Sequence, residues 1–353
     1  MIRIAVIYGG QSTEHSISCI SAGAIMAELP RDAFEVFPVG ITRDGTWVEG
    51  SLDPVQGREL PEVTGGRAVC LSTHPSTRGT FTDPATGEVV AEVDVVFPVL
   101  HGKYGEDGTI QGLFELSGVP YVGPGVLASA CGMDKEYTKK LVEAEGIAVA
   151  PGAILRAGET LSDTDRDRLG LPVFVKPANG GSSIGVSKVD TWEELEPALE
   201  LAFAEDTKVL VEGALHGDEV EVGVLEYPDG RVEASVPARL NGTEDSAEGF
   251  YGFETKYLDD EVTATIPAPY GEATTEKLQQ LAVTAFQALN CASLARVDFF
   301  LTAGGPVLNE VNTMPGFTSI SMYPQVWQAS GLSYPELLRT LVTTALERGS
   351  RRQ

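Results

Sequence analysis

Four polar residues on two short runs form the strongest chemical pattern in the chain. Arg296 and Asp298 alternate in the first run, and Glu310 and Asn312 alternate in the second. Residues two apart on a strand share a face, so a hairpin through residues 303–305 would bring all four side chains together. Carboxylate and amide oxygens suit Mg²⁺, whose coordination phosphates and water complete. A solvent-facing hairpin with ordinary charges explains the same pattern equally well.

A glycine-rich loop, residues 179–185, directly follows Lys176 and Pro177. Glycines let the backbone approach an anion closely, and serine hydroxyls with successive N–H groups can form an anion-binding concavity. Lys176 would add a positive charge. The pattern is not G-x-x-x-x-G-K-[ST], because the lysine precedes the loop and both flanks have a strand-like pattern. Taken alone, the loop is more simply explained as a hairpin turn without a ligand.

Two further polar loops follow strand-like runs near the N-terminus. His101 and the segment 105–108 follow the run that ends at Leu100, and Glu14 follows the first run of the chain. Ligands of open α/β sheets bind outside the carboxyl ends of the strands, so both loops are expected to open toward one crevice. A surface position for His15 and a helix-dipole role for Glu14 are the alternatives that need no ligand.

The charge balance limits the possible ligands. The chain of 353 residues has 25 Lys and Arg against 51 Asp and Glu, a formal net charge of −26. Such a surface repels nucleic acid. A polyphosphate must therefore be held by a few placed cations or by metal. With no nucleophilic Ser/His/Asp or Cys/His set to propose, the pattern favours ATP-driven chemistry in which the substrate supplies the nucleophile.

Cysteine usage and the N-terminal sequence predict the compartment. The four cysteines are scattered singly, without metal-ligand spacing or the density of a disulfide framework. A reducing compartment fits this usage best. We find neither a signal region nor a run long and apolar enough to span a membrane. These observations predict a cytoplasmic protein without membrane or nucleic-acid partners.

Apolar periodicity predicts the elements that must position these residues. The first part of the chain alternates strand-like and helix-like runs, which predicts a parallel sheet: strands at residues 2–8, 35–41 and 93–100, helices at 16–29 and 108–116. Further along we expect helices at 133–145, 192–204 and 272–289, strands at 149–155, 171–176, 184–189 and 208–211, and hairpins of 220–227 with 231–239 and of 296–301 with 306–311. Residues 51–88 give no clear prediction, and the aperiodic residues 241–260 are expected to form a functional loop or lid.

Several motifs together resemble the D-alanine:D-alanine ligases. They are GGQSTE at 9–14, LHG at 100–102, GEDG at 105–108, MDK at 133–135, VKP at 175–177, GSS at 181–183, KY at 256–257 and NEVNTMPGFT at 309–318. The match runs in order from Ile2 to about Tyr323. The resemblance implies an ATP-grasp fold, α/β plus α+β. It would consist of a doubly wound N-terminal domain (1–124), a central subdomain with the glycine loop (125–212), and a C-terminal subdomain with the lid and metal site (213–353).

The resemblance also implies a reaction. ATP phosphorylates the carboxylate of one D-alanine, and the amine of a second D-alanine attacks the acyl phosphate to give a peptidoglycan precursor. The implied cofactors are ATP and two Mg²⁺ ions, with Mn²⁺ as a possible substitute, and the implied assembly is a homodimer.

Site residues follow from the matched motifs. The nucleotide would be bound by Lys135, Lys176, Ser182, Ser183, Glu212, Gly213, Leu215, Glu219, Lys256 and Asn309, and the metal by Asp298, Glu310 and Asn312. Glu14 would orient the first D-alanine's ammonium, with His101 nearby. Arg296 and the Gly316 backbone would stabilise the oxyanion. Ser321 and Met322 would contact the second D-alanine, and Tyr257 and Ser182 would join Glu14 in the catalytic set.

Other functions share part of this pattern. D-serine or D-lactate could be the acceptor, although a neutral phenol at Tyr257 favours an amine, where ligases that use D-lactate have histidine. Another ATP-grasp carboxylate–amine ligase could share the metal residues but would lack the paired signals at 101–102 and 256–257. A non-catalytic relative would be expected to have lost a metal ligand or the phosphate lysine.

Overall fold

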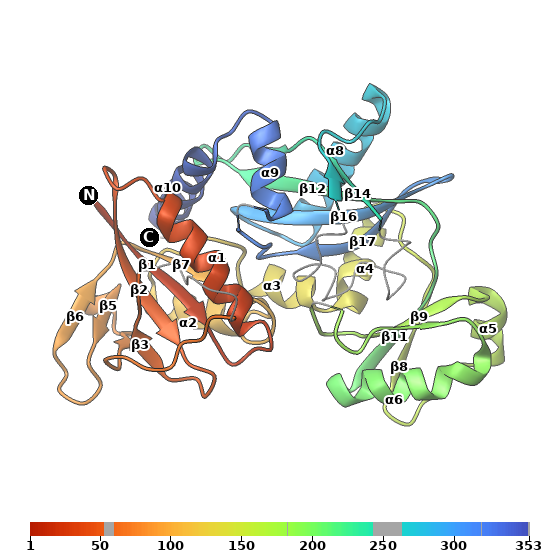
Figure 1. Cartoon of the computed structure of the whole chain (residues 1–353), viewed down its shortest axis with the longest axis horizontal. Helices are drawn as coiled ribbons and strands as arrows, with labels where there is room; N and C mark the ends of the chain where they lie inside the picture. The colour runs from red at the N-terminus through yellow and green to blue at the C-terminus, as the bar shows by residue number, and fades with distance from the viewer. Residues whose placement is uncertain (53–59, 182, 243–262, 319, 352–353) are drawn as a thin grey trace.

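The structure is a computed structural model that describes residues 1–52, 60–181, 183–242, 263–318 and 320–351. The described residues form four β-sheets (Figure 1). Three of these sheets position the residues singled out above, and the fourth is a small sheet beside the first. Among the described helices, none combines the length and the apolar character needed to cross a bilayer.

The first sheet has the order β3-β2-β1-β7. Its elements are β1 (Ile2–Gly9), α1 (His15–Glu28), β2 (Phe34–Ile41), β3 (Trp47–Glu49), β7 (Val95–Val99) and α2 (Thr109–Ser117). β1 pairs in parallel with β2 and β7, as the alternating pattern predicts. Alternate residues of β1 enter two different cores: Ile4 and Val6 face α1, and Ala5 and Ile7 pack with Phe114 of α2. Burial on both faces explains the continuous apolar run of this strand.

Residues 51–88, which gave no clear prediction, contribute most of the small antiparallel sheet. Its elements are β4 (Cys70–Leu71), the 3₁₀ helix η1 (Pro75–Thr77), β5 (Thr80–Thr82) and β6 (Val89–Glu92). Strands of two to four residues are too short to show a period in the sequence. Phe81 anchors this sheet in the core beneath β1, where its side chain is fully buried.

The second sheet has the order β10-β9-β11-β8 and is antiparallel throughout. Its elements are β8 (Gly152–Arg156), α5 (Asp163–Leu169), β9 (Val173–Pro177), β10 (Ser187–Val189), the 3₁₀ helix η2 (Trp192–Glu194), α6 (Leu195–Glu205) and β11 (Lys208–Gly213). Val173 and Val175 alternate with less buried residues and pack against α6. The glycine loop connects β9 to β10, so the predicted strands on both of its sides are confirmed.

The third sheet has the order β15-β14-β12-β16-β17, with β13 pairing on β12. Its elements are β12 (Asp218–Glu226), β13 (Val232–Ala234), β14 (Ala238–Asn241), β15 (Thr263–Thr265), α8 (Glu272–Ala288), β16 (Leu294–Thr302) and β17 (Gly305–Asn312). The predicted hairpin of β16 and β17 is confirmed. The single strand expected at 231–239 is wrong, because it is split into β13 and β14 before Pro237, which has no N–H to continue a ladder.

The helix expected at 133–145 is confirmed as α4 (Lys135–Ala144), and a further helix that was not predicted, α3 (Val126–Met133), precedes it. Asp134 separates them because its backbone is extended and its carboxylate caps α4 by accepting from the N–H groups of Glu136 and Tyr137. Both helices contact β17 of the third sheet, and Val142 of α4 lies in that sheet's core. The central unit expected at 125–212 thus begins with helices that pack on the third sheet, and the domain division stays a prediction.

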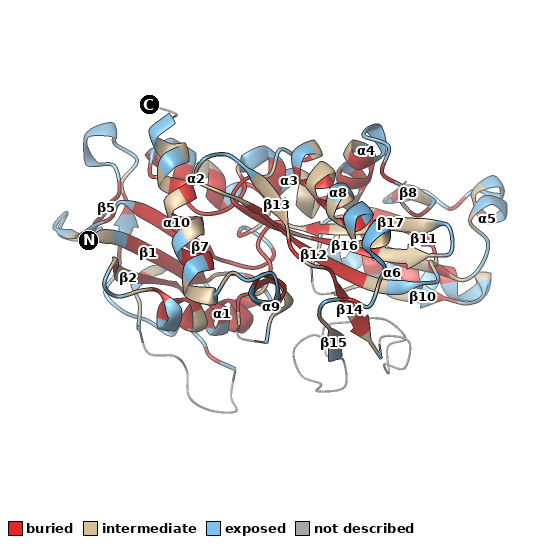
Figure 2. Ribbon diagram, turned by 90° about the horizontal axis from the view of Figure 1, so that it is seen from above, coloured by how far each residue is buried: buried red, intermediate tan, exposed pale blue. Residues whose placement is uncertain are grey.

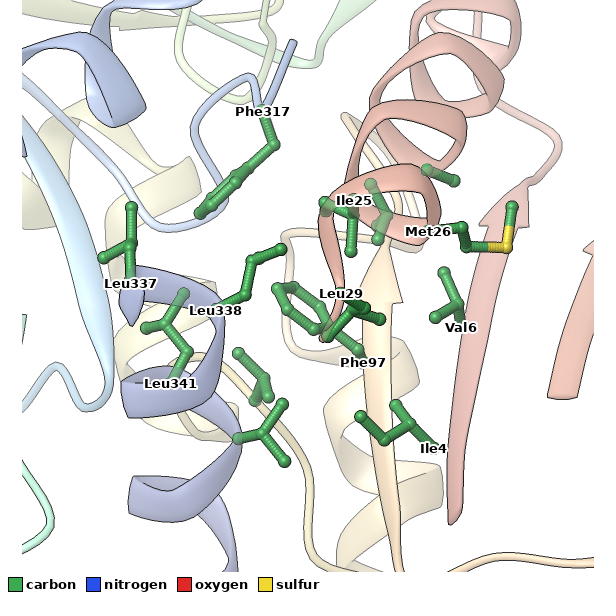
Figure 3. Close-up of a cluster of buried hydrophobic side chains, with 14 of the residues drawn as sticks. Ile4, Val6, Ile25, Met26, Leu29, Phe97, Phe317, Leu337, Leu338 and Leu341 are labelled. Carbon is green, nitrogen blue, oxygen red and sulfur yellow. The ribbon is translucent and has the colours of Figure 1, made fainter. Parts of the chain in front are cut away.

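The C-terminal helices join the third sheet to the first. They are α9 (Met322–Ala329) and α10 (Tyr334–Arg351). Leu338 and Leu341 of α10 meet Phe97 of β7 and Leu29 after α1, and Phe317 lies in the same core (Figure 3). The buried residues therefore continue from the first sheet into the third (Figure 2).

Candidate active site

One cavity of about 540 Å³ is lined by residues of the second and third sheets, by residues of α4, and by residues of the loops that follow β1 and β7 of the first sheet. Most of the predicted site residues line it: Glu14, His101, Lys135, Lys176, Ser183, Glu212, Gly213, Leu215, Glu219, Arg296, Asp298, Asn309, Glu310, Asn312 and Gly316. Ser321 and Met322 are not among its lining residues. Ser182, Lys256, Tyr257 and the lid from residue 243 onward lie outside the described residues.

The hairpin of β16 and β17 places the four alternating polar residues together, as predicted. Arg296 lies opposite Asn312, and Asp298 lies opposite Glu310, with a register shift immediately after Asp298. The Asn312 amide donates to Asp298 at 2.9 Å. The oxygen donors fit a hard divalent cation by their chemistry. Among the described residues, however, no three His, Cys, Asp or Glu side chains are grouped as a metal cluster.

Arg296 is held by two carboxylates. Its guanidinium donates to both oxygens of Asp298, at 2.8 and 2.7 Å, and its Nε lies 3.0 Å from Glu221. Burial alone would lower the pKa of Arg296, but the two carboxylates raise it well above its ordinary value. Arg296 is therefore a permanent, oriented cation in the cavity wall. Glu221 was missed from the sequence, since its pairing with Asp298 across β12 and β16 becomes visible only in the register.

A buried ion cluster lies where the second sheet and α4 line the cavity. The carboxylate of Glu212 lies 2.8 Å from the Lys176 ammonium and also contacts Lys139. Burial raises the pKa of Glu212, but the two lysines outweigh it and hold the pKa at about 2. Lys139 was missed from the sequence. Its position one helical turn after Lys135 in α4 was the available signal.

Lys135 begins α4 and reaches the glycine loop, where its ammonium donates to the Gly180 carbonyl at 2.8 Å. Burial, with a contribution from the neighbouring Lys176, lowers its pKa to about 8 even though Glu310 acts in the opposite direction. A bound anion would restore the pKa of Lys135. The backbone N–H of Lys135 also donates to Ala178, which fixes the helix N-terminus beside the loop.

The glycine loop, which belongs to the second sheet, reaches Glu14 in the loop that follows β1 of the first sheet. A Cβ on Gly181 would lie 3.1 Å from Oε2 of Glu14, and one on Gly102 would lie 2.5 Å from the same oxygen. The backbones of Gly102 and Gly181 thus both approach the Glu14 carboxylate, and a side chain at either position would collide with it or crowd it. Gly102 also has a φ of 73°, a region that favours glycine.

Glu106 was missed as a site residue, although it belongs to the motif at 105–108. It lines the cavity and accepts from the N–H of Gly102 at 2.6 Å and from the N–H of Met314 at 3.2 Å. Burial and the nearby Glu14 raise the pKa of Glu106 to about 8.

The surface position considered for His15 is wrong. His15 is fully buried, and its ring bonds both to the Gly10 carbonyl and to the N–H of Val63.

Comparison with known proteins identifies the family. The model of the D-ala D-ala ligase N-terminus matches residues 3–124, and that of the D-ala D-ala ligase C-terminus matches residues 141–343. The chain is 60% identical to the D-alanine–D-alanine ligase of Corynebacterium diphtheriae, covering 98% of this chain and 96% of that protein. It is 56% identical to the ligase of the same name from Rhodococcus erythropolis, covering 99% and 98%. The chain is a ligase and belongs to the D-alanine–D-alanine ligase family.

Solved structures agree with this assignment. The D-alanine–D-alanine ligase from Coxiella burnetii has a TM-score of 0.85 at 32% identity and covers 100% of this chain and 96% of its own. The VanG D-Ala:D-Ser ligase from Enterococcus faecalis has a TM-score of 0.82 at 36% identity, covering 98% and 99%. The Bacillus anthracis D-alanine–D-alanine ligase complexed with ATP has a TM-score of 0.75 at 27% identity and covers both chains fully.

Proposed function

We propose that this protein joins two D-alanine molecules into D-alanyl-D-alanine, using ATP to activate the first carboxylate, for peptidoglycan precursor synthesis. One observation carries the proposal: the same cavity is lined by Lys135 and Lys176, by the acids of β16 and β17, and by Glu14. The names of its relatives support this activity.

The nucleotide would lie between the second and third sheets, as in an ATP-grasp clamp. Lys135 and Lys176 would neutralise phosphates, and they line the cavity together with residues of the glycine loop, including Ser183. Glu212, Gly213 and Leu215 end β11 and begin the following loop, where they would meet adenine, and Glu219 would hold the ribose. Asn309 lies beside the metal residues on β17. Phosphoryl transfer depends mainly on positioning and charge neutralisation, which these residues would supply.

Two Mg²⁺ ions would be held by Asp298, Glu310 and Asn312, with Mn²⁺ as a substitute. When bound, the ions would neutralise phosphate charge. Arg296 already donates to both oxygens of Asp298, which fixes the orientation of that carboxylate in the cavity wall.

The amino acids would lie toward the N-terminal sheet. Glu14 would bind the ammonium of the first D-alanine, while Arg296 and the N–H of Gly316 would stabilise the oxyanion that forms when the second amine attacks. Ser321 lies close enough to Gly316 for a Cβ there to approach its Oγ within 2.9 Å. Ser321 and Met322 would therefore bind the second D-alanine beside the oxyanion site.

The remaining catalytic roles rest on the motif resemblance. Lys256 would reach the γ-phosphate from the lid, and Tyr257 and Ser182 would link the lid to Glu14. A lid is required chemically, because water hydrolyses an acyl phosphate.

The acceptor is the sharpest point to test, since one structural relative is a D-Ala:D-Ser ligase. We propose D-alanine as the preferred acceptor, because the phenol of Tyr257 stays neutral and leaves an amine unopposed. D-alanine, D-serine and D-lactate should compete for the purified enzyme with ATP and MgCl₂, and mass spectrometry should identify the product between pH 6 and 9. The dipeptide should predominate at neutral pH. D-Alanyl-D-lactate or D-alanyl-D-serine as the main product would contradict the acceptor assignment.

Tyr257→His provides the matched variant for this competition. Use of D-lactate should rise as the pH falls toward 6, because a histidinium favours an incoming acid. An unchanged product ratio across this range would separate acceptor choice from Tyr257.

We also propose a homodimer in the cytoplasm. All four cysteines, Cys19, Cys70, Cys131 and Cys291, are free thiols, which fits a reducing compartment. Light scattering of the purified protein tests the dimer directly.

A further inference from the structure

The backbone of Met314 is held at both its N–H and its carbonyl by the loop that follows β7. Its N–H donates to Oε1 of Glu106 at 3.2 Å, and its carbonyl lies 3.1 Å from Nδ1 of His101. These contacts join residues that are 208 and 213 positions apart in the sequence. Met314 directly precedes Pro315 and Gly316, so whatever holds Met314 also places the Gly316 N–H.

His101 is suited to hold this loop. A carbonyl oxygen can only accept, so Nδ1 must be the nitrogen that donates to Met314. Nε2, which lies 3.3 Å from the Ser21 hydroxyl, is then the acceptor of the neutral ring. Burial lowers the pKa of His101, which favours this neutral form. Both ring nitrogens are engaged with protein groups.

Glu106 connects the Met314 backbone to the Gly102 backbone, which lies beside Glu14. Its Oε2 accepts from the N–H of Gly102 at 2.6 Å, while its Oε1 accepts from Met314. The Cα of Gly102 borders Glu14 so closely that an added Cβ would lie 2.5 Å from the Glu14 carboxylate. The planar carboxyl group of Glu106 therefore sets the distance between the Gly102 backbone, which lies beside Glu14, and the Met314 backbone, which leads to Gly316.

We propose that Glu106 is a positioning residue, which fixes the distance between the ammonium site at Glu14 and the oxyanion site at Gly316. The inference rests on the proposed function, since the reaction defines both sites. D-Alanine must present its ammonium to Glu14 and its carboxyl carbon to Gly316 at once, and a displacement of about 1 Å can cost roughly 100-fold in rate. Loss of Glu106 should therefore lower kcat and spare nucleotide binding, which uses the second and third sheets.

Two variants grade this effect. Glu106→Gln keeps one carbonyl acceptor, whereas Glu106→Met keeps a similar length and removes both. We expect kcat for D-alanine-dependent ADP release to fall by about 10-fold in the first and about 100-fold in the second. The Kd of a fluorescent ATP analogue, measured without D-alanine, should stay within about threefold of the unmodified protein. Should the Met variant fail to fold, the same comparison applies to the Gln variant.

Asp107 provides a matched control in the same loop. Its carboxylate also accepts two backbone N–H groups, from Tyr104 at 2.8 Å and Thr109 at 3.0 Å, but both lie within the loop. Asp107→Asn should keep kcat within about threefold, because it leaves the bond to Met314 intact.

Three results would overturn the inference: an unchanged kcat in both Glu106 variants, a parallel loss of nucleotide affinity, or an equal loss of kcat in Asp107→Asn. Absence of D-alanine-dependent ADP release from the unmodified protein would instead defeat the proposed function. The two failures are therefore distinguishable.

Discussion

Asp298 on β16 and Glu310 on β17 are directly opposed partners in an antiparallel ladder. Like charges at facing positions destabilise a sheet. Asp298 is compensated by the Arg296 guanidinium, and the register shift that follows it marks an irregular ladder of the kind found beside active sites. A divalent cation bound by both carboxylates would replace this repulsion by attraction.

Glu310→Gln removes one charge of this opposed pair. The variant should lose at least about 100-fold in turnover, because charge on the transferring phosphate loses a neutralising partner. Its melting temperature without metal should be equal to or above that of the unmodified protein, and MgCl₂ should raise it less. Phosphate release and thermal melts with and without MgCl₂ measure these effects. Glu92→Gln, on β6 opposite Thr80, is the control strand acid. Near-normal turnover of Glu310→Gln would refute the metal assignment.

Lys135 predicts a pH dependence of nucleotide binding. Its pKa is about 8 in the folded protein against 10.5 for a free lysine. Between these values the unfolded chain binds the additional proton, so this group makes the stability of the unliganded protein rise with pH across that window. A bound phosphate raises the pKa again. Binding of ATP should therefore take up a proton above pH 8, and its affinity should fall there.

Calorimetric titration in two buffers of different ionisation enthalpy measures this proton uptake. Lys135→Arg stays charged and should abolish the uptake, whereas Lys277→Arg, an exposed lysine of α8, should not change it. Equal uptake in the unmodified protein and in Lys135→Arg would assign the proton to another group.

Glu212 should be important for stability as well as for nucleotide binding. Glu212→Gln leaves Lys139 and Lys176 buried with no carboxylate between them, and breaking such a pair costs about 3–5 kcal/mol. Glu35→Gln breaks an ion pair with Arg3 in which both side chains are about half exposed, and should cost at most about 1 kcal/mol. Urea unfolding compares the two variants. Equal free energies of unfolding would show that the buried cluster contributes no more than a surface pair.

Gly316→Ala tests the oxyanion role proposed for the Gly316 backbone. The added methyl would lie 2.9 Å from Oγ of Ser321, which accepts from the N–H of Thr318 at 2.9 Å, so the hydroxyl must move. We expect kcat to fall by about 10- to 100-fold and the KM of the second D-alanine to rise. Gly304→Ala, in the β16–β17 turn, meets its nearest neighbour at an ordinary 3.6 Å and should behave like the unmodified protein. Identical kinetics of the two variants would exclude Gly316 from the reaction.

The sequence by itself determined the local parts of the site. The β16–β17 hairpin was predictable because a strand's period of two and its Gly-rich turn are recorded in adjacent residues. The same holds for the strands around the glycine loop and for the parallel pairing of β1 with β2. The ordered motifs were specific enough to indicate the family, which the comparisons confirmed.

Only the tertiary structure decided which distant residues meet. Long stretches of chain separate Lys139 from Glu212 and Glu106 from Met314. No spacing in the sequence indicates that these residues come into contact. The burial of His15 likewise depends on the N–H of Val63, which another segment delivers. Periodicity reports which face of an element is apolar, whereas the partner of that face is set by packing of the whole chain. The partners of the buried charges and the distances between the loops that line the cavity could therefore be known only from the folded structure.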